Sequence, residues 1–379
     1  MNFRNLEDAS FDSTTYIIGP NACGKSNLLD ALRFLRDIAK PAGVKPSGGG
    51  LQKAVADRGG LKRVRCLNSR KDPVVFLEVE VESDAAQPTW TYRLGFKGEG
   101  KANNRITIDS EEVWQGEQSV LGRPDDADRK DPERLTQTSL EQINANVDFR
   151  ALAHFLSSIT YLHLVPQLLK FSDQIGGNQL ERDPFGQGFL LRVADTNEKT
   201  RNARLRRIQE ALGKVVPQFK ELRFNRDKVS GHPHIEANFA HWRVNGSWQR
   251  EDQFSDGTLR LLGLLWSLME GESLLLLEEP ELSLNEDIVK MLPRLIRRVQ
   301  RLSKSSRQVL LTTHSEALLS DQSIGAESVI RLMPSAEGTQ IAPASTEEKT
   351  MLESGFSVGE VLLAAVKPKS VEQLELAIN

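Results

Sequence analysis

A glycine-rich loop near the N-terminus constrains the fold of this chain more than any other feature. Residues 19–26 read Gly-Pro-Asn-Ala-Cys-Gly-Lys-Ser and fit the pattern G-x-x-x-x-G-K-[ST]. The apolar residues 16–18 before the loop predict a buried strand, and leucines at helical spacing after Lys25 predict a helix that reaches Ile38. A strand, this loop and a helix in that order predict a phosphate-binding turn, because backbone N–H groups at a helix N-terminus attract phosphate.

The loop pattern assigns chemistry to two of its side chains. The ammonium group of Lys25 is expected to bridge the β- and γ-phosphates of a nucleotide, and the Ser26 hydroxyl is expected to bind Mg²⁺. The alternative is a glycine-rich turn that fits the pattern by chance, which the flanking strand and helix disfavour. ATP and Mg²⁺ are therefore the predicted ligands.

Two further apolar strands are predicted to end in polar residues. Residues 274–277 are four leucines followed by Glu278 and Glu279, and residues 308–312 lead to His314. Ligands in open α/β sheets bind outside the carboxyl ends of the strands. One carboxylate is therefore expected to hold the Mg²⁺ shell and the next to polarise the attacking water, with a turn after a core strand as the alternative. His314 is expected to hydrogen-bond the γ-phosphate or to be structural.

Residues 254–260, Phe-Ser-Asp-Gly-Thr-Leu-Arg, are predicted to open another helix. Ser255 or Asp256 is suited to cap its first turn. An exposed helix N-terminus also binds phosphate. The residues alone leave both roles open.

The order of the remaining patterns predicts an α/β protein with a mostly parallel central sheet. Strands and helices alternate in the C-terminal third, which is typical of parallel sheets. Period-two alternation in residues 77–82 and 90–96 predicts an antiparallel β subdomain. Helical patterns dominate residues 140–212. Between residues 123 and 134, nine of twelve residues are charged and two are proline, which predicts a solvated linker.

Three parts are therefore expected along the chain. Residues 1–125 would form an N-terminal lobe with the phosphate loop and the antiparallel strands. Residues 126–250 would form a mainly helical insertion, and residues 251–379 a C-terminal lobe with the carboxylate strand and His314.

Composition limits the cellular compartment and the classes of binding partner that we expect. The chain has 49 Lys and Arg against 52 Asp and Glu, so any contact with nucleic acid must be a local patch. Two cysteines, Cys23 and Cys66, are too few for a disulfide framework. No apolar run approaches the ~20 residues of a membrane span, and the N-terminus lacks the apolar core of a signal peptide. We expect a cytoplasmic protein without membrane contact.

Taken together, the motifs resemble those of ABC-type ATPases, and more narrowly the RecF/SMC/OLD-like AAA family of bacterial DNA repair and phage defence. The resemblance covers about residues 1–40 and 250–335 and implies a P-loop ABC-type ATPase head with a helical insertion. The matching motifs are N-F-R-N at 2–5, G-P-N-x-x-G-K-S-N at 19–27, S-D-G-T at 255–258, E-E-P-E at 278–281 and T-T-H-S at 312–315.

This resemblance implies a role for each matched residue. Glu279 is implied as the catalytic carboxylate, Glu278 as the Mg²⁺ ligand and His314 as the switch histidine. Ser255 and Gly257 belong to the signature that contacts ATP held by the opposite subunit of a head-to-tail homodimer. The loop residues implied to bind the nucleotide are Asn21, Gly24, Lys25, Ser26 and Asn27.

The chain departs from the family pattern in two places. Glu278 stands where aspartate is usual and is one methylene longer, which implies a looser Mg²⁺ shell. Cys23 places a thiol beside the expected phosphates. The glutamine loop of the family is not assignable from the sequence, and Gln52 is one candidate.

The resemblance implies an ATPase that dimerises around ATP and acts in DNA repair or anti-phage defence. A separate effector, such as a nuclease, is expected, because the residues after His314 lack the Glu-then-D-x-D pattern of a TOPRIM nuclease. DNA is a further expected partner. The alternatives are an ATPase subunit of a membrane transporter, which the absence of L-S-G-G-Q disfavours, and a non-catalytic ATP-bound scaffold, which Glu279 disfavours.

Two groups of basic residues at helical spacing could face DNA phosphates or form solvated helix faces. We favour the solvated faces. The first group is Arg294, Arg297, Arg298, Arg301, Lys304 and Arg307, and the second is Arg201, Arg204, Arg206 and Arg207.

Overall fold

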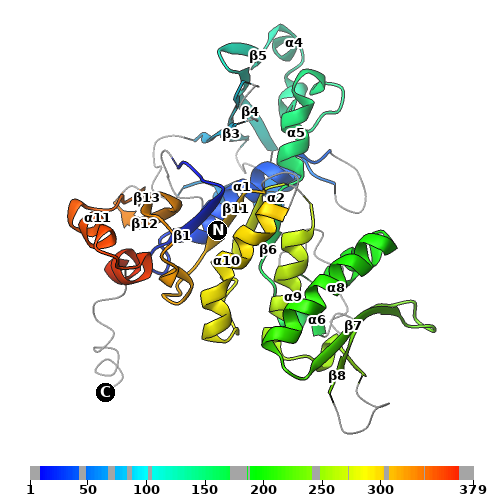
Figure 1. The fold of residues 1–379 in the computed structure, drawn as a ribbon. Coiled ribbons are helices and arrows are strands. Elements are labelled where there is room, and N and C mark those ends of the chain that lie inside the picture. Colours follow the sequence, from blue (N-terminus) through cyan, green and yellow to red (C-terminus); the bar gives the residue numbers. More distant parts are fainter. Residues whose placement is uncertain are drawn as a thin grey trace, which may run out of the picture. The chain divides into compact units, whose positions relative to one another are not determined.

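The computed structural model of the chain confirms the predicted α/β class, with a mostly parallel sheet and separate antiparallel sheets (Figure 1). The predicted motif at residues 2–5 and Lys304 lie outside the described residues. The structure describes residues 9–41, 48–66, 73–82, 88–100, 105–170, 186, 188–240, 248–271, 273–302, 307–336 and 338–366.

By its contacts the chain divides into two compact units. Unit 1 comprises Met1–Ala9, Asn21–Ile159 and Leu332–Ala342, and unit 2 comprises Ser10–Pro20, Thr160–Arg331 and Pro343–Asn379. These bounds differ from the three predicted segments, and the three-part division stays a prediction.

A parallel sheet forms the centre of unit 2. Its strand order is β12-β1-β11-β10-β6, and each neighbouring pair is parallel. All residues of β1 and β11 are buried, as expected for strands that are covered on both faces. The strands are β1 (Thr14–Ile18), β6 (Thr160–Leu162), β10 (Leu275–Glu278), β11 (Val309–Thr312) and β12 (Val329–Ser335).

Six α-helices and a three-stranded antiparallel sheet also belong to the described part of unit 2. Helix α8 packs along α9, and the buried ring of Trp266 on α9 meets Phe189 of α7 edge to face at 6.3 Å. The helices are α6 (Pro166–Lys170), α7 (Phe189–Asp195), α8 (Glu198–Val215), α9 (Asp256–Met269), α10 (Glu286–Leu302) and α11 (Thr346–Glu353), and the strands are β7 (Phe219–Arg226), β8 (Pro233–Phe239) and β9 (Trp248–Arg250).

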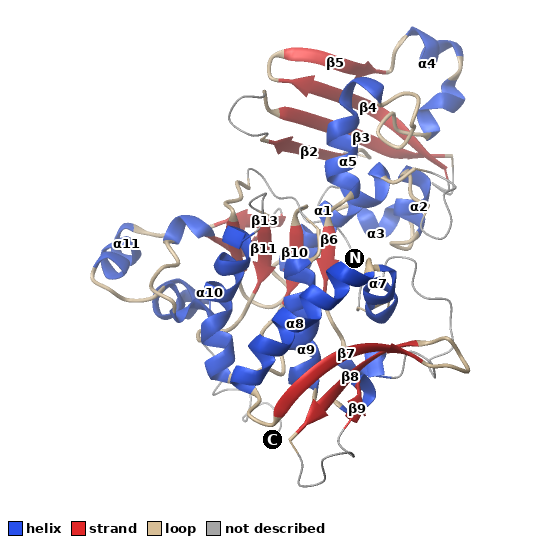
Figure 2. Ribbon diagram, turned by 45° about the vertical axis from the view of Figure 1, so that its right-hand side comes forward, coloured by secondary structure: helices blue, strands red, loops and turns tan. Residues whose placement is uncertain are grey.

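Unit 1 contains the predicted antiparallel strands, in the order β2-β3-β4-β5 (Figure 2). Their side chains alternate between buried and more exposed positions, and the ring of Phe96 on β3 lies 5.6 Å from that of Phe34 on α1. The end of β12 also pairs antiparallel with β13 (Gly338–Ile341) in this unit. The strands are β2 (Val75–Val81), β3 (Trp90–Glu99), β4 (Arg105–Gln115) and β5 (Gln118–Arg123), and the helices are α1 (Lys25–Ala39), α2 (Leu51–Ala56), α3 (Leu61–Val64), α4 (Asp126–Lys130) and α5 (Arg150–Ser157).

The charged segment at residues 123–134 is mostly exposed, as the sequence predicts, but two of its charged residues, Arg123 and Asp128, are buried. Arg123 donates hydrogen bonds to Glu111 and Asp128, both at 2.9 Å, and the three side chains are only 3%, 0% and 0% exposed. The hydrogen bond from Arg123 holds the pKa of Asp128 well below its ordinary value. A count of charged residues does not reveal this burial, because Arg123 pairs with Asp128 of the same segment and with Glu111 of β4.

A membrane-spanning helix must be long and apolar. Within the described ranges, no helix is both long enough and apolar enough to cross a bilayer.

We predict that Arg123→Met lowers the free energy of unfolding of unit 1 by about 3–5 kcal/mol, because it leaves the buried carboxylate of Glu111 without its cation and leaves that of Asp128 with the half-exposed Arg134 alone. Urea unfolding followed by circular dichroism measures the loss. Arg129→Met is the matched control, since Arg129 and its partner Asp126 are 71% and 86% exposed, and it should change stability by less than about 0.5 kcal/mol. Equal losses in the two variants would contradict the role given to Arg123.

Candidate functional site

The phosphate loop leaves the sheet of unit 2 at the end of β1 and enters α1 of unit 1. Its backbone has positive φ angles at Gly19 (154°), Ala22 (63°) and Gly24 (112°). Gly24 is the N-cap residue of α1 and supplies no side chain to cap it, and its carbonyl accepts a hydrogen bond from the Leu28 N–H at 2.9 Å. An uncapped helix start after a glycine turn is the local geometry that phosphate prefers.

Within unit 1, the loop places its predicted residues Asn21, Gly24, Lys25, Ser26 and Asn27 at or beside the first turn of α1. Lys25 is 8% exposed. The neighbouring thiol does not face solvent, since Cys23 is 0% exposed, and the Cys23 carbonyl accepts a hydrogen bond from Thr339 Oγ1 at 2.6 Å. The bond ties the loop to β13.

In unit 2, Glu278 lies at the carboxyl end of β10, as predicted. It is opposite Thr312, the last residue of the parallel strand β11. The hydroxyl of Tyr161 on β6, the other neighbour of β10, donates a short hydrogen bond to Glu278 Oε2, and His163 Nδ1 lies 3.3 Å from the Glu278 carbonyl oxygen. The Glu278 side chain is thus held in place by the strand beside it.

Glu279 follows at once and has a strained backbone. Its φ of 44° is unusual for a residue other than glycine, and residues held in such regions gather at functional sites. Two acceptors of Thr312 fix its N–H, the carbonyl oxygen at 3.1 Å and Oγ1 at 3.2 Å. Its carboxylate oxygen Oε1 lies 3.6 Å from His314 Nε2. The structure therefore brings Glu279 and His314 together.

Glu281, in the turn after β10, contacts the turn after β11 at the same edge of the sheet. Its Oε1 atom accepts hydrogen bonds from Thr313 Oγ1 at 2.7 Å and from the His314 N–H at 3.1 Å. Burial raises the pKa of Glu281 above its ordinary value. The side chain thereby joins the turn after β10 to the turn after β11 and orients the backbone of His314.

The start of α9 confirms the capping reading of Ser255. Ser255 is the N-cap residue, and its Oγ accepts from the Thr258 N–H at 3.2 Å. Asp256 accepts hydrogen bonds from Gln167 and Lys170, both at 2.7 Å. A Cβ on Gly257 would lie 2.7 Å from the backbone carbonyl oxygen of Ser283, so this position needs glycine for packing within unit 2. Contact with ATP across a dimer stays a prediction for Ser255 and Gly257.

Sequence reasoning missed two residues of this region. The register of β6 beside β10 places Tyr161 next to Leu276, but no motif marks it. Arg260, one turn into α9, interacts electrostatically with Glu279 and Glu281, and burial lowers its pKa. Its Nε atom is buried and has no hydrogen-bond partner among the described residues. Its place two residues after the S-D-G-T motif is the signal that could have found it.

Gln52 does not have the freedom that a glutamine-loop residue needs. Its amide nitrogen donates to the carbonyl oxygens of Ile106 at 2.7 Å and Thr136 at 2.9 Å, and its amide oxygen accepts from the Ile106 N–H at 3.2 Å. The side chain fastens α2 to β4 within unit 1, so the candidate role is not supported.

The donor chemistry fits a hard divalent cation. Ser26 offers a hydroxyl and Glu278 a carboxylate, and Mg²⁺ prefers oxygen ligands that it completes with substrate phosphates. In the part of the chain that the structure describes, no three His, Cys, Asp or Glu side chains gather into a site that could hold a metal by themselves.

Comparisons with known proteins agree with this local structure. A family model described as "AAA domain, putative AbiEii toxin, Type IV TA system" matches residues 15–320. No curated protein sequence matches the chain.

Among solved structures, an SMC head bound to the C-winged helix domain of ScpA is 15% identical, with a TM-score of 0.54, over 89% of this chain and 93% of that chain. The SMC head domain from Thermotoga maritima is 17% identical, with a TM-score of 0.44, over 91% and 96%. The recombination mediator protein RecF is 17% identical, with a TM-score of 0.34, over 91% and 96%. The first likeness shows that the chain has the fold of an SMC head.

We predict that Tyr161→Phe lowers the free energy of unfolding by about 1.5–3 kcal/mol, because it removes a hydrogen bond to a carboxylate. The double variant with Glu278→Gln tests the contact directly. Urea unfolding of the two single variants and the double variant should give a coupling energy of at least about 0.5 kcal/mol. Additive losses would show that the hydroxyl does not act through Glu278.

Proposed function

The chain belongs to the family of AAA domains whose model it matches over residues 15–320, and we propose that it is an ABC-type ATPase that hydrolyses ATP to ADP and phosphate with Mg²⁺. The observation that carries this proposal is the shared carboxyl edge of the sheet in unit 2. There β1 leads into the phosphate loop, β10 ends at Glu278 and is followed by Glu279, and β11 leads to His314.

Each residue has a task that its position supports. The start of α1 and Lys25 bind the phosphates, as positive charge and N–H groups do in phosphate loops. Mg²⁺, when bound, neutralises charge on the phosphates, and Ser26 and Glu278 would hold it. Glu279 accepts a proton from the attacking water. His314, 3.6 Å from Glu279, donates a hydrogen bond to the γ-phosphate.

The proposed dimer places a second subunit's signature on the nucleotide. Ser255 is exposed at the N-terminus of the 14-residue helix α9, and a helix start of this kind favours phosphate. Ser255 and Gly257 would therefore contact ATP that is bound to Lys25 of the partner subunit. The role of Ser255 as N-cap residue is compatible with this contact, because capping leaves its hydroxyl at the helix start.

The biological role that we propose is DNA repair or anti-phage defence in the cytoplasm, together with a separate effector such as a nuclease. The description of the matching family, which names a toxin of a toxin–antitoxin system, supports the defence role. DNA is the proposed trigger or substrate of the assembly.

Glu279→Gln should bind ATP but hydrolyse it about 10²–10⁴-fold more slowly, because the water loses its general base. The variant should accumulate as an ATP-bound dimer, which size-exclusion chromatography with Mg²⁺-ATP detects. Lys25→Ala is the control that should lose nucleotide binding itself. Undiminished hydrolysis by Glu279→Gln, or a monomer throughout, would overturn the role of Glu279.

A mixing experiment tests the shared site. Ser255→Asp keeps a good N-cap residue but adds negative charge toward phosphate, so it should fold normally and be inactive. Lys25→Ala should also be inactive. Heterodimers of the two variants contain one intact site, so an equal mixture should recover about a quarter of the wild-type ATPase rate if subunits exchange freely.

The control for this experiment carries both changes on one chain and should rescue neither single variant. If heterodimers form and no activity returns, the contact of Ser255 across the dimer is wrong.

A further inference from the structure

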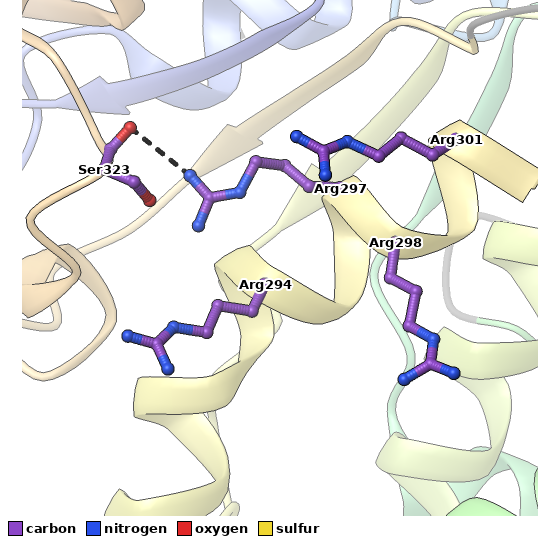
Figure 3. Close-up of a pocket in the computed structure, with 5 residues that line it drawn as sticks. All are labelled: Arg294, Arg297, Arg298, Arg301 and Ser323. Atoms are coloured by element: carbon purple, nitrogen blue, oxygen red, sulfur yellow. Dashed lines mark hydrogen bonds between the residues drawn. The ribbon is translucent and has the colours of Figure 1, made fainter.

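Four arginines on consecutive turns of α10 line a groove on the surface of unit 2. Figure 3 shows Arg294, Arg297, Arg298 and Arg301 projecting from α10, with Ser323 facing Arg297. We call these five residues the arginine groove. They include four members of the first basic group that the sequence predicts.

Three other arginines of the basic groups are engaged within unit 2. Arg307 lies after α10 and is buried, and its guanidinium donates to the carbonyl oxygens of Ser273 at 2.6 Å and of Ser267. Arg201 and Arg204 on α8 lie over the rings of Phe224 and Trp266 at 4.1 and 5.2 Å. Arg307 is thus buried, and Arg201 and Arg204 stack on aromatic rings, although helical spacing alone places all three with exposed arginines.

Within the arginine groove, one buried carboxylate organises two of the guanidinium groups. Asp321, whose side chain is 4% exposed, accepts from Arg294 Nε at 3.1 Å and from Arg297 at 2.9 Å. Arg297 also donates to the Ser323 carbonyl oxygen at 3.3 Å. These bonds fix the two side chains before any ligand binds, and they leave further N–H donors of each guanidinium unused, since each has five.

Arg298 and Arg301 are different, because they are exposed and form no hydrogen bond or ion pair with any residue in the described ranges. Asp321 is the acidic side chain that contacts the groove, so four positive charges meet one negative charge. The groove therefore carries a local excess of about three positive charges on a chain whose net charge is −3.

The lining of the groove distinguishes between classes of polyanion. All five lining residues are polar, whereas the centre of a protein interface is enriched in aromatic side chains and methionine. Proteins that bind single-stranded nucleic acid stack its bases on aromatic rings, and none of the five described residues that line this groove is aromatic. A lining of guanidinium groups, without aromatic rings or methionine, is suited to the backbone of a nucleic-acid duplex. The phosphates of that backbone accept hydrogen bonds from paired N–H donors.

The spacing of the arginines agrees with that ligand. Arg294 and Arg301 are seven residues apart, which is about 10 Å along a helix axis at ~1.5 Å per residue. Each strand of duplex DNA carries one phosphate per about 3.4 Å of its axis. The groove can therefore follow about three successive phosphates of one strand.

We propose that the arginine groove binds the sugar–phosphate backbone of double-stranded DNA. The choice of partner rests on the proposed function, because that function places the protein on DNA. Binding is independent of base sequence, since the contacts are to phosphates alone, and it weakens steeply with salt as counterions return to the DNA.

The test measures equilibrium binding of a fluorescent blunt DNA duplex to the full chain by anisotropy at several KCl concentrations. Arg298→Ala/Arg301→Ala should weaken binding at least tenfold at low salt. It should also reduce the slope of log K against log[salt] by about 2, one unit for each lost phosphate contact. The matched control is Arg206→Ala/Arg207→Ala, which removes the same charge from two exposed arginines of α8. It should change binding by less than about twofold if the groove is the site.

Each other outcome overturns the proposal. Equal losses in the two double variants would show that net charge alone attracts DNA. No measurable binding by the wild type would show that the groove is not a DNA site. If DNA does bind, its displacement by polyglutamate more readily than by unlabelled duplex would identify the ligand as an acidic protein segment. Thermal unfolding of the variants confirms that they fold, because exposed residues without partners contribute little to stability.

The ATPase rate of the same samples without DNA separates this proposal from the proposed function. The two groove substitutions should leave that basal rate unchanged. DNA binding without ATP hydrolysis in the wild type would refute the proposed ATPase and leave the groove standing. Hydrolysis with no groove-dependent binding would do the reverse.

Discussion

The parallel pairing of β1, β10 and β11 is the constraint on which the candidate site in unit 2 depends. Ile17 and Glu278 both pair with Thr312, so the three strands end at one level of the sheet. The leucines of β10 and the residues of β11 are buried on both faces of the sheet, so a slip of β10 by one residue would carry Glu278 into the apolar interior or expose a leucine at the edge. Apolar burial therefore fixes the register, and the register fixes where the polar residues that follow the strands emerge.

Hydrogen bonds then convert that common edge into a defined arrangement of carboxylates. Thr312 holds the N–H of Glu279 in a strained backbone conformation, and Glu281 holds the N–H of His314. These bonds connect the turn after β10 to the turn after β11. The proposed base and the proposed switch histidine are thus kept within reach of each other by backbone contacts, before any nucleotide contributes binding energy.

Features that depend on local pattern could be predicted from the sequence, and features that depend on partners could not. The phosphate loop, the helix α1 and the strand Val309–Thr312 follow from spacing within a few residues, and the structure has them where the sequence predicts them. Other contacts depend on which elements pack together. They are the buried pair of Arg123 and Glu111, the hydrogen bonds of the buried Arg307, and those that Gln52 makes with β4. Charge and composition cannot reveal those pairs, because the same residue types are solvated when no partner folds against them.

Glu278 illustrates how a departure from a family pattern finds its reason in a neighbouring strand. The longer side chain was expected to loosen the Mg²⁺ shell, since each extra bond adds rotational freedom. The Tyr161 hydroxyl removes much of that freedom by holding Oε2, and a buried phenol in turn needs an acceptor. An aspartate at 278 would be one methylene shorter and would withdraw its carboxylate from β6. The glutamate and the tyrosine therefore satisfy each other, and the Tyr161 hydroxyl fixes the Glu278 carboxylate at the sheet edge.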